Sequence, residues 1–355
     1  MLEKYRQFLP IPKGVETNDL GEGNTPMVRS GTLNPGGNLL FKMEQMNPTG
    51  SFKDRFASLE TLLIKSSGRQ AFIATSSGNT GAALAAYAAR RGLDCFLFVN
   101  EVVPESKLNQ MPVYGAKVFR VKDFGISHEL SAPIFQRLQE FSVEENIPLV
   151  ISAYKYCPDG MEGVKPIAYE IVEQLGKVPD RVFVPVGGGG LLSGIWRGFC
   201  DLKENGIVDS LPKMMAVQPE LNDTLVTPLS QSLDKAREVS TTTTISGLAV
   251  QVDIDATMAL QSVKASGGAG VLVTDEQIRD AKTRLSMEEG IYVEAAGASS
   301  VTGYLKALAD GAVSEDETSV CILTGHGLKD AATGSDIASR IHDITADDIT
   351  KELVA

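Results

Sequence analysis

The chain has 355 residues, more than a typical single hydrophobic core, which favours two domains or lobes. Its content of 43% hydrophobic and 22% charged residues is ordinary for a globular protein. The formal net charge of -12 excludes nucleic acid and anionic membrane surfaces as main partners, although a locally positive site can still bind a small anion.

The four cysteines lie far apart without a C-x-x-C pair, and only three histidines are present. This spacing predicts reduced, mostly buried thiols, and it indicates neither a disulfide framework nor a metal site. Residues 1–14 mix charges and prolines without the apolar segment of a secretory signal, and no apolar run is long enough to cross a bilayer. We therefore expect a soluble, cytoplasmic protein.

In chain order, short apolar runs rich in β-branched residues alternate with helical segments. Strands are predicted over residues 70–75, 95–100, 116–121, 181–186, 214–219 and 318–324. Helices are predicted over residues 78–92, 105–116, 191–202 and, as an acidic surface helix, 339–355. Continuous apolar strands separated by helices indicate an α/β fold with parallel sheets covered on both faces. Since no long linker is visible, we expect two lobes joined by several crossings, with the site between them.

The stretch "MNPTGSFKDR", residues 46–55, begins as a turn and then places a single lysine, Lys53, before an Asp-Arg pair. A lone lysine is normally a solvated surface charge. Its interpretation therefore depends on what the rest of the chain places near it.

The stretch "TSSGNTG" opens the helix predicted over residues 78–92. Serine, asparagine and threonine are preferred as helix caps, so capping alone could explain it. A cap needs one such residue, however, and several small polar positions in a row suit the binding of a carboxylate at the exposed N–H groups. The loop is interpreted as a recognition element for an anionic substrate. Its members are Ser76, Ser77, Gly78, Asn79 and Thr80.

Four consecutive glycines, Gly187, Gly188, Gly189 and Gly190, follow the strand predicted over 181–186 and precede a helix. Without side chains, the backbone can approach a ligand closely and direct its N–H groups toward it. Together with the positive end of the helix dipole, these groups make a phosphate cradle. A merely flexible connection is the alternative, and no G-x-G-x-x-G or Walker motif is present.

A phosphate cradle and a carboxylate loop change the interpretation of Lys53. A lysine amine forms a Schiff base with an aldehyde, and pyridoxal phosphate is an aldehyde cofactor that carries a phosphate. The combination predicts a pyridoxal phosphate site around Lys53.

The motifs "LGEGNTPMV", "NPTGSFKDR", "SSGNTGAALAAYAARRG", "GGGGLLSG", "EAAGASSVTGYLKAL" and "TGHGLKD" together resemble the fold-type II (tryptophan synthase β-like) pyridoxal phosphate enzymes, and most of all the threonine synthases. The resemblance runs from about residue 20 to residue 330. It implies a two-lobed enzyme, with residues 55–160 as a smaller lobe and residues 1–54 and 161–355 as a larger one. It also implies a homodimer and replacement or elimination on an activated amino acid, such as O-phosphohomoserine to threonine.

The resemblance also implies roles for individual residues. Lys53 would hold the cofactor and act as acid and base, and Asn79 would bind the phenolic oxygen of the cofactor. Thr324 would face its pyridine nitrogen, where a hydroxyl suits side-chain elimination and replacement better than transamination. The four glycines would bind the cofactor phosphate. The substrate carboxylate would be surrounded by Ser76, Ser77, Gly78 and Thr80.

Two departures from the threonine synthase pattern leave alternatives open. The phosphate loop has plain glycines where threonine synthases usually carry asparagine, as in serine and threonine dehydratases. Gly160 stands where the family would place a phosphate-binding arginine, with Lys155 and Lys165 as imperfect substitutes. One alternative is β-replacement or β-elimination on serine, phosphoserine or threonine, as in cysteate synthase or a dehydratase. The other is a non-catalytic cofactor- or amino-acid-binding protein.

Overall fold

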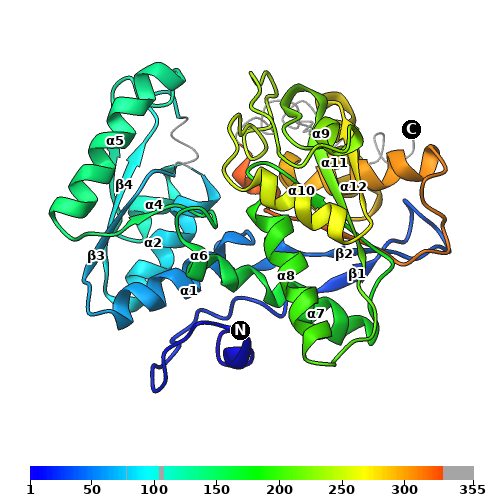
Figure 1. The fold of residues 1–355 in the computed structure, drawn as a ribbon, viewed down its shortest axis with the longest axis horizontal. Coiled ribbons are helices and arrows are strands. Elements are labelled where there is room, and N and C mark those ends of the chain that lie inside the picture. The colour runs from blue at the N-terminus through cyan, green and yellow to red at the C-terminus, as the bar shows by residue number, and fades with distance from the viewer. Residues whose placement is uncertain (77, 104–107, 331–355) are drawn as a thin grey trace, which may run out of the picture.

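The computed structural model describes residues 1–76, 78–103 and 108–330. Three earlier predictions fall outside these residues. They are the role of Ser77, the first three residues of the helix predicted over 105–116, and the whole helix predicted over 339–355. Within the described residues, no helix is long and apolar enough to cross a membrane. The chain forms two separate β-sheets with helices packed against them (Figure 1).

The smaller sheet has four parallel strands in the order β5-β4-β3-β6. Helices α1 and α2 pack their apolar side chains against one face, and α5 covers the other (Figure 1). We call this sheet and its helices the small lobe. Its elements are α1 (Lys53–Ser66), β3 (Ala71–Ala74), α2 (Asn79–Arg91), β4 (Asp94–Val99), α4 (Gln110–Val113), β5 (Lys117–Arg120), α5 (His128–Glu144) and β6 (Leu149–Val150).

The larger sheet has six strands in the order β1-β2-β10-β7-β8-β9. All neighbours are parallel except β1 and β2, which pair antiparallel at one edge. We call this sheet and its helices the large lobe. Its strands are β1 (Met27–Arg29), β2 (Leu39–Lys42), β7 (Arg181–Pro185), β8 (Lys213–Pro219), β9 (Ala269–Val273) and β10 (Ser319–Ile322). Its helices are α7 (Pro166–Leu175), α8 (Gly190–Glu204), α9 (Val226–Ser230), α10 (Ala256–Ala265), α11 (Asp275–Glu288) and α12 (Ala295–Ala309).

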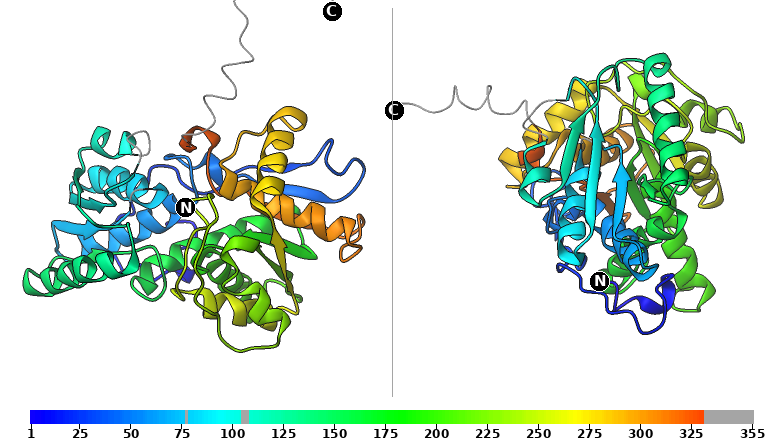
Figure 2. Two further views of the ribbon diagram at one scale, coloured as in Figure 1. Left: turned by 90° about the horizontal axis from the view of Figure 1, so that it is seen from above. Right: turned by 90° about the vertical axis from the view of Figure 1, so that its left-hand side faces the viewer.

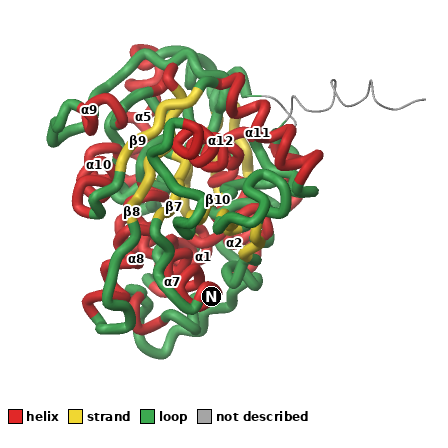
Figure 3. The backbone as a smooth tube through the Cα atoms, turned by 90° about the vertical axis from the view of Figure 1, so that its right-hand side faces the viewer, coloured by secondary structure: helices red, strands yellow, loops and turns green. Residues whose placement is uncertain are grey.

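Alternating side chains place a hydrophobic core on each face of the larger sheet. In β7, Val182 and Val184 belong to the core that includes α7, α8 and α10, whereas Phe183 belongs to the core that includes α11 and α12. Figure 3 shows these helices around the row of central strands. Because successive side chains of a strand point to opposite faces, a strand that is apolar throughout is buried on both. The predicted α/β fold with parallel-rich, doubly covered sheets is therefore confirmed.

Short connecting elements join the lobes, and the N-terminus lies near their junction in Figure 1 and in the left view of Figure 2. The tilted rings of Tyr5 and Tyr169, 5.1 Å apart, pack this segment against α7. The division between residues 55–160 and the rest of the chain stays a prediction. The connecting elements are η1 (Arg6–Phe8), η2 (Glu44–Met46), α6 (Pro158–Met161), η3 (Glu162–Val164), η4 (Glu220–Asn222) and η5 (Gly327–Lys329).

Candidate active site

A cavity of about 1180 Å³ is lined by residues of both lobes. It brings together every candidate site residue that the structure describes. Lys53 and Thr324 line it with the glycine loop 187–190 and with the loop at the start of α2. Of that second loop, Ser76, Gly78, Asn79 and Thr80 are lining residues, and Ser77 lies outside the described residues.

Lys53 is the first residue of α1, and its place is fixed by backbone bonds between the 46–55 turn and the end of β10. The Phe52 N–H donates to the Thr324 carbonyl at 2.9 Å, and the His326 N–H donates to the Gly50 carbonyl at 2.9 Å. Gly50 has φ +86°, a left-handed conformation that favours glycine. These contacts place the lysine beside Thr324 although the two are far apart in the sequence.

The Lys53 ammonium lies between the lobes. Its Nζ donates to Ser152 Oγ at 2.7 Å, just beyond β6 of the small lobe. Burial lowers the pKa of Lys53 to about 8, while the carboxylates of Asp255 and Glu294 act in the opposite direction. A buried lysine with a lowered pKa supplies neutral amine near physiological pH, as a nucleophile or a proton acceptor requires.

The two residues after Lys53 hold its helix in place. Asp54 accepts the Thr49 N–H at 2.6 Å and also bonds the Thr49 hydroxyl, which closes the turn before the lysine. Burial raises the pKa of Asp54 to about 7 although the Thr49 bonds oppose it. The Lys-Asp-Arg triplet thus combines one side chain in the cavity with two that anchor it.

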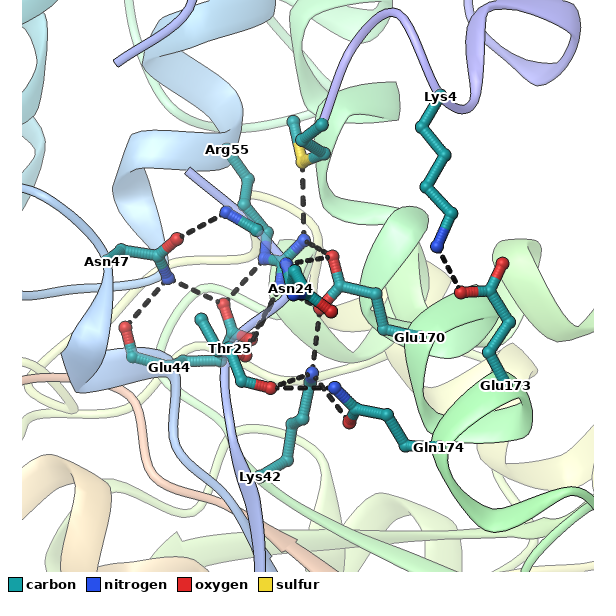
Figure 4. A network of polar contacts seen from close by, with 12 residues as sticks. Lys4, Asn24, Thr25, Lys42, Glu44, Asn47, Arg55, Glu170, Glu173 and Gln174 are labelled. Atoms are coloured by element: carbon teal, nitrogen blue, oxygen red, sulfur yellow. Dashed lines mark hydrogen bonds and ion pairs between the residues drawn. The ribbon is translucent and has the colours of Figure 1, made fainter. Parts of the chain in front are cut away.

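Arg55 lies in a buried ionic network beneath the turn, made of Lys42, Glu44, Arg55 and Glu170 (Figure 4). Arg55 Nε donates to Glu44 Oε2 at 2.6 Å, and Arg55 Nη2 donates to Glu170 Oε2 at 2.7 Å. Lys42 Nζ reaches the same Glu170 oxygen at 2.7 Å. Two cations thus balance two carboxylates, and they join α1 to β2, η2 and α7. A buried network with every charge paired holds one geometry, because loss of any member leaves a buried charge uncompensated.

The glycine loop leaves β7 and enters α8 with its backbone packed tightly against other backbone. Gly189 has φ +101°, and a Cβ there would lie 2.5 Å from the Asp255 carbonyl oxygen. A Cβ at Gly187 would lie 2.7 Å from the Gly247 carbonyl oxygen. Gly188 has more space, since the nearest atom to its Cβ would be Val250 Cγ1 at 4.0 Å. Two of these glycines are therefore required by the close approach of the backbone.

Helices α2 and α8, which begin at the cavity, have no side-chain cap among the described residues. The N-cap residues are Gly78 for α2 and Gly189 for α8, and neither can supply one. The explanation of the first loop by capping therefore has no support from its described residues. Uncapped first-turn N–H groups at two helix N-termini favour bound anions.

Glu294 was not singled out in the sequence, although it begins the motif "EAAGASS". It is the N-cap residue of α12, and its carboxylate accepts from Asn79 Nδ2 at 2.9 and 3.2 Å and from Thr324 Oγ1 at 3.1 Å. Burial raises its pKa despite these bonds. Glu294 therefore links two predicted cofactor contacts, one from each lobe.

The cavity lining includes neither Gly160, which stands where the family would place a phosphate-binding arginine, nor its possible substitutes Lys155 and Lys165. Gly160 is buried, and a Cβ there would lie 2.1 Å from Glu60 Oε2. Lys165 is buried in ion pairs with Glu162 and Asp201, each at 2.7 Å. Lys155 is likewise absent from the lining. None of these three residues therefore places a cation at the cavity.

Comparison with known proteins shows the family to which this chain belongs. Threonine synthase from Methanocaldococcus jannaschii is 38% identical over 337 residues, covering 92% of this chain and 80% of that protein. Threonine synthase from Halalkalibacterium halodurans is 35% identical and covers 94% of this chain and 90% of its own. Among solved structures, maize serine racemase matches with a TM-score of 0.74 at 23% identity. The match covers 89% of this chain and 92% of that one, and it shows that the two share a fold. The family described as pyridoxal-phosphate dependent enzyme matches residues 19–325, and the chain belongs to that family.

Proposed function

We propose that this chain converts O-phosphohomoserine and water into threonine and inorganic phosphate, with pyridoxal phosphate as cofactor. The observation that carries the proposal is the convergence of Lys53, the glycine loop and the uncapped start of α2 on one cavity. The choice of substrate is supported by relatives named threonine synthase that are 32–38% identical over most of the chain.

The cavity fits the cofactor at its phosphate end. The glycine loop is shaped by close backbone contacts at Gly187 and Gly189, and α8 starts directly after it without a side-chain cap. A phosphate is the ligand that such a loop binds best. We assign the cofactor phosphate to this loop, the phenolic oxygen to Asn79 and the ring nitrogen to Thr324.

Bound pyridoxal phosphate supplies an electron sink next to the substrate carbons. Lys53 would hold the cofactor covalently, and its amine would accept and return protons at the substrate carbons. A pKa of about 8 keeps part of its amine neutral at physiological pH. Glu294 orients Asn79 through the bond described above.

The N-terminus of α2 binds the substrate carboxylate in this proposal. Ser76, Gly78 and Thr80 line the cavity there, and the first-turn N–H groups have no side-chain cap among the described residues. We assign Ser77 the same role from its place in the sequence. The cytoplasmic location and the homodimer stay predictions.

A substrate panel tests the proposal and separates it from its alternatives. Purified enzyme with its cofactor is given O-phosphohomoserine, O-phosphoserine, serine or threonine, and products and the cofactor spectrum are followed. We expect threonine and phosphate from O-phosphohomoserine and no turnover by Lys53→Ala. Oxo-acid and ammonia from serine or threonine would establish a dehydratase instead. A change in the cofactor spectrum without any product would establish a binding protein.

A further inference from the structure

A second lysine lines the cavity and has no role in the proposed function. Lys329 ends η5, directly after the "TGHG" turn that follows β10. Among the described lining residues, the basic side chains are those of Lys53, His326 and Lys329, and no arginine is present. Since Lys53 is assigned to the cofactor, Lys329 is the remaining lysine of the described lining that can bind an anion.

Lys329 reaches across the boundary between the lobes. Its Nζ donates to Gln110 Oε1 at 2.8 Å, and Gln110 is the first residue of α4 in the small lobe. The amide of Gln110 also donates from Nε2 to the Thr49 carbonyl at 3.2 Å. The stem of the lysine passes over Gly50, because its Cε lies 3.0 Å from the position that a Cβ would take there. The ammonium is therefore held beside the turn that carries Lys53.

The electrostatic setting of Lys329 favours an anionic ligand. Its hydrogen-bond partner is a neutral amide, and no ion pair joins it to a carboxylate of the described residues. Burial lowers its pKa, whereas the more distant carboxylates of Glu294 and Asp54 act against that change. A largely buried cation without a paired anion costs free energy, and an incoming dianion offsets that cost. The neutral amide oxygen is also a weaker acceptor for this ammonium than a phosphate oxygen, because a phosphate adds the attraction between opposite charges to the hydrogen bond.

The position of Lys329 differs from the cradle assigned to the cofactor phosphate. The backbone of the glycine loop packs against Gly247 and Asp255, whereas Lys329 contacts Gly50 and Gln110. A substrate with a carboxylate and a phosphate needs two anion-binding positions besides that cradle. The start of α2 provides the first.

We propose that Lys329 binds the phosphate group of the substrate, exchanging its bond to the neutral amide of Gln110 for an ion-paired hydrogen bond to a phosphate oxygen. This inference rests on the proposed function. It gives the cavity the cation that Gly160, Lys155 and Lys165 do not supply.

The test compares Lys329→Met, which keeps an apolar stem and removes the charge, with Lys329→Arg, which keeps the charge. Lys306→Met on α12 is the matched control, because Lys306 forms a surface pair with Asp310 at 3.4 Å. The holoenzyme of each variant is assayed for the KM of O-phosphohomoserine. Calorimetry measures the binding of inorganic phosphate to the holoenzyme, and titration of apoenzyme measures cofactor affinity.

We expect Lys329→Met to raise both the KM and the dissociation constant of inorganic phosphate by about 10- to 100-fold, as for a lost charged hydrogen bond. Cofactor affinity stays within about twofold of wild type, Lys329→Arg recovers much of the loss, and Lys306→Met changes nothing. Unchanged phosphate binding overturns the inference, and so does an equal loss of cofactor affinity. If wild type forms no threonine, the proposed function fails, while the phosphate titration still decides whether Lys329 binds phosphate.

Discussion

Single alanine substitutions in the glycine loop provide a sharp test of its geometry, because adjacent positions differ in what a Cβ would meet. At Gly189, φ is +101° and the new Cβ would lie 2.5 Å from the Asp255 carbonyl oxygen. A non-glycine residue held in a sparsely populated backbone region costs about 1–3 kcal/mol. At Gly188 the nearest atom to the new Cβ is 4.0 Å away, and φ lies outside the left-handed region. Gly-to-Ala replacement in an allowed conformation stabilises by about 0.4–1 kcal/mol through the unfolded chain.

The expected result is therefore opposite in sign for two neighbouring residues. Gly189→Ala lowers the free energy of unfolding of the apoprotein by at least about 1–3 kcal/mol, and Gly188→Ala leaves it unchanged or raises it slightly. Denaturant titration followed by circular dichroism measures both. If the loop of Gly189→Ala instead relieves the strain by shifting, cofactor affinity falls by roughly 5- to 150-fold, because about 1–3 kcal/mol of strain must be restored when the cofactor binds. Equal stability and equal cofactor affinity in the two variants would refute the described loop.

Three further predictions concern charges around the site. Gly188→Asp adds a carboxylate to the loop with little steric conflict, so apoprotein stability changes little. Cofactor affinity falls severely, because the new carboxylate repels the cofactor phosphate. Unchanged affinity would show that the loop binds something else. Arg55→Met leaves two buried carboxylates without their shared partner and lowers the free energy of unfolding by about 3–5 kcal/mol. The same change at the exposed Arg137 costs less than about 1 kcal/mol, and equal losses would contradict the network's importance. Because the Lys53 pKa is lowered to about 8, the rate of cofactor uptake by apoenzyme rises with pH and levels off above that value. Asp255→Asn removes a charge that favours the ammonium form of Lys53, so the midpoint of this pH dependence moves to lower pH in stopped-flow absorbance measurements. A midpoint that stays in place or rises would show that Asp255 does not act on Lys53.

Features that depend on neighbouring residues could be predicted from the sequence. The strand, glycine turn and helix around residues 181–204 follow local rules of apolar runs and chain reversal, and the structure contains them as β7, the loop and α8. The helix 79–91 ends at Gly92, which adopts the left-handed conformation expected of a glycine after a helix. The family resemblance then connected these loops to one cofactor, and family membership is confirmed.

Features that depend on packing could not be predicted in the same way. The sequence of the 46–55 turn does not indicate its hydrogen bonds to residues 324–326. These bonds form because β10 pairs with β2 and so brings residues 324–326 beside the turn. Glu294 begins a helix, and a sequence pattern does not distinguish an N-cap glutamate from one that bonds two side chains of a cavity. Gly160, Lys155 and Lys165 do not line the cavity, because closeness to a motif in the sequence does not fix position in space. Which of four glycines needs a positive φ is likewise a property of the folded loop.

The fate of oxygen from water tests the central claim most directly. The enzyme with its cofactor is given O-phosphohomoserine in water enriched in the heavy oxygen isotope, and both products are examined by mass spectrometry. If the site breaks the carbon–oxygen bond and water adds to carbon, the label appears in the hydroxyl group of threonine and is absent from the released phosphate. Label in the phosphate with homoserine as the other product, or no product from this substrate, would contradict the account.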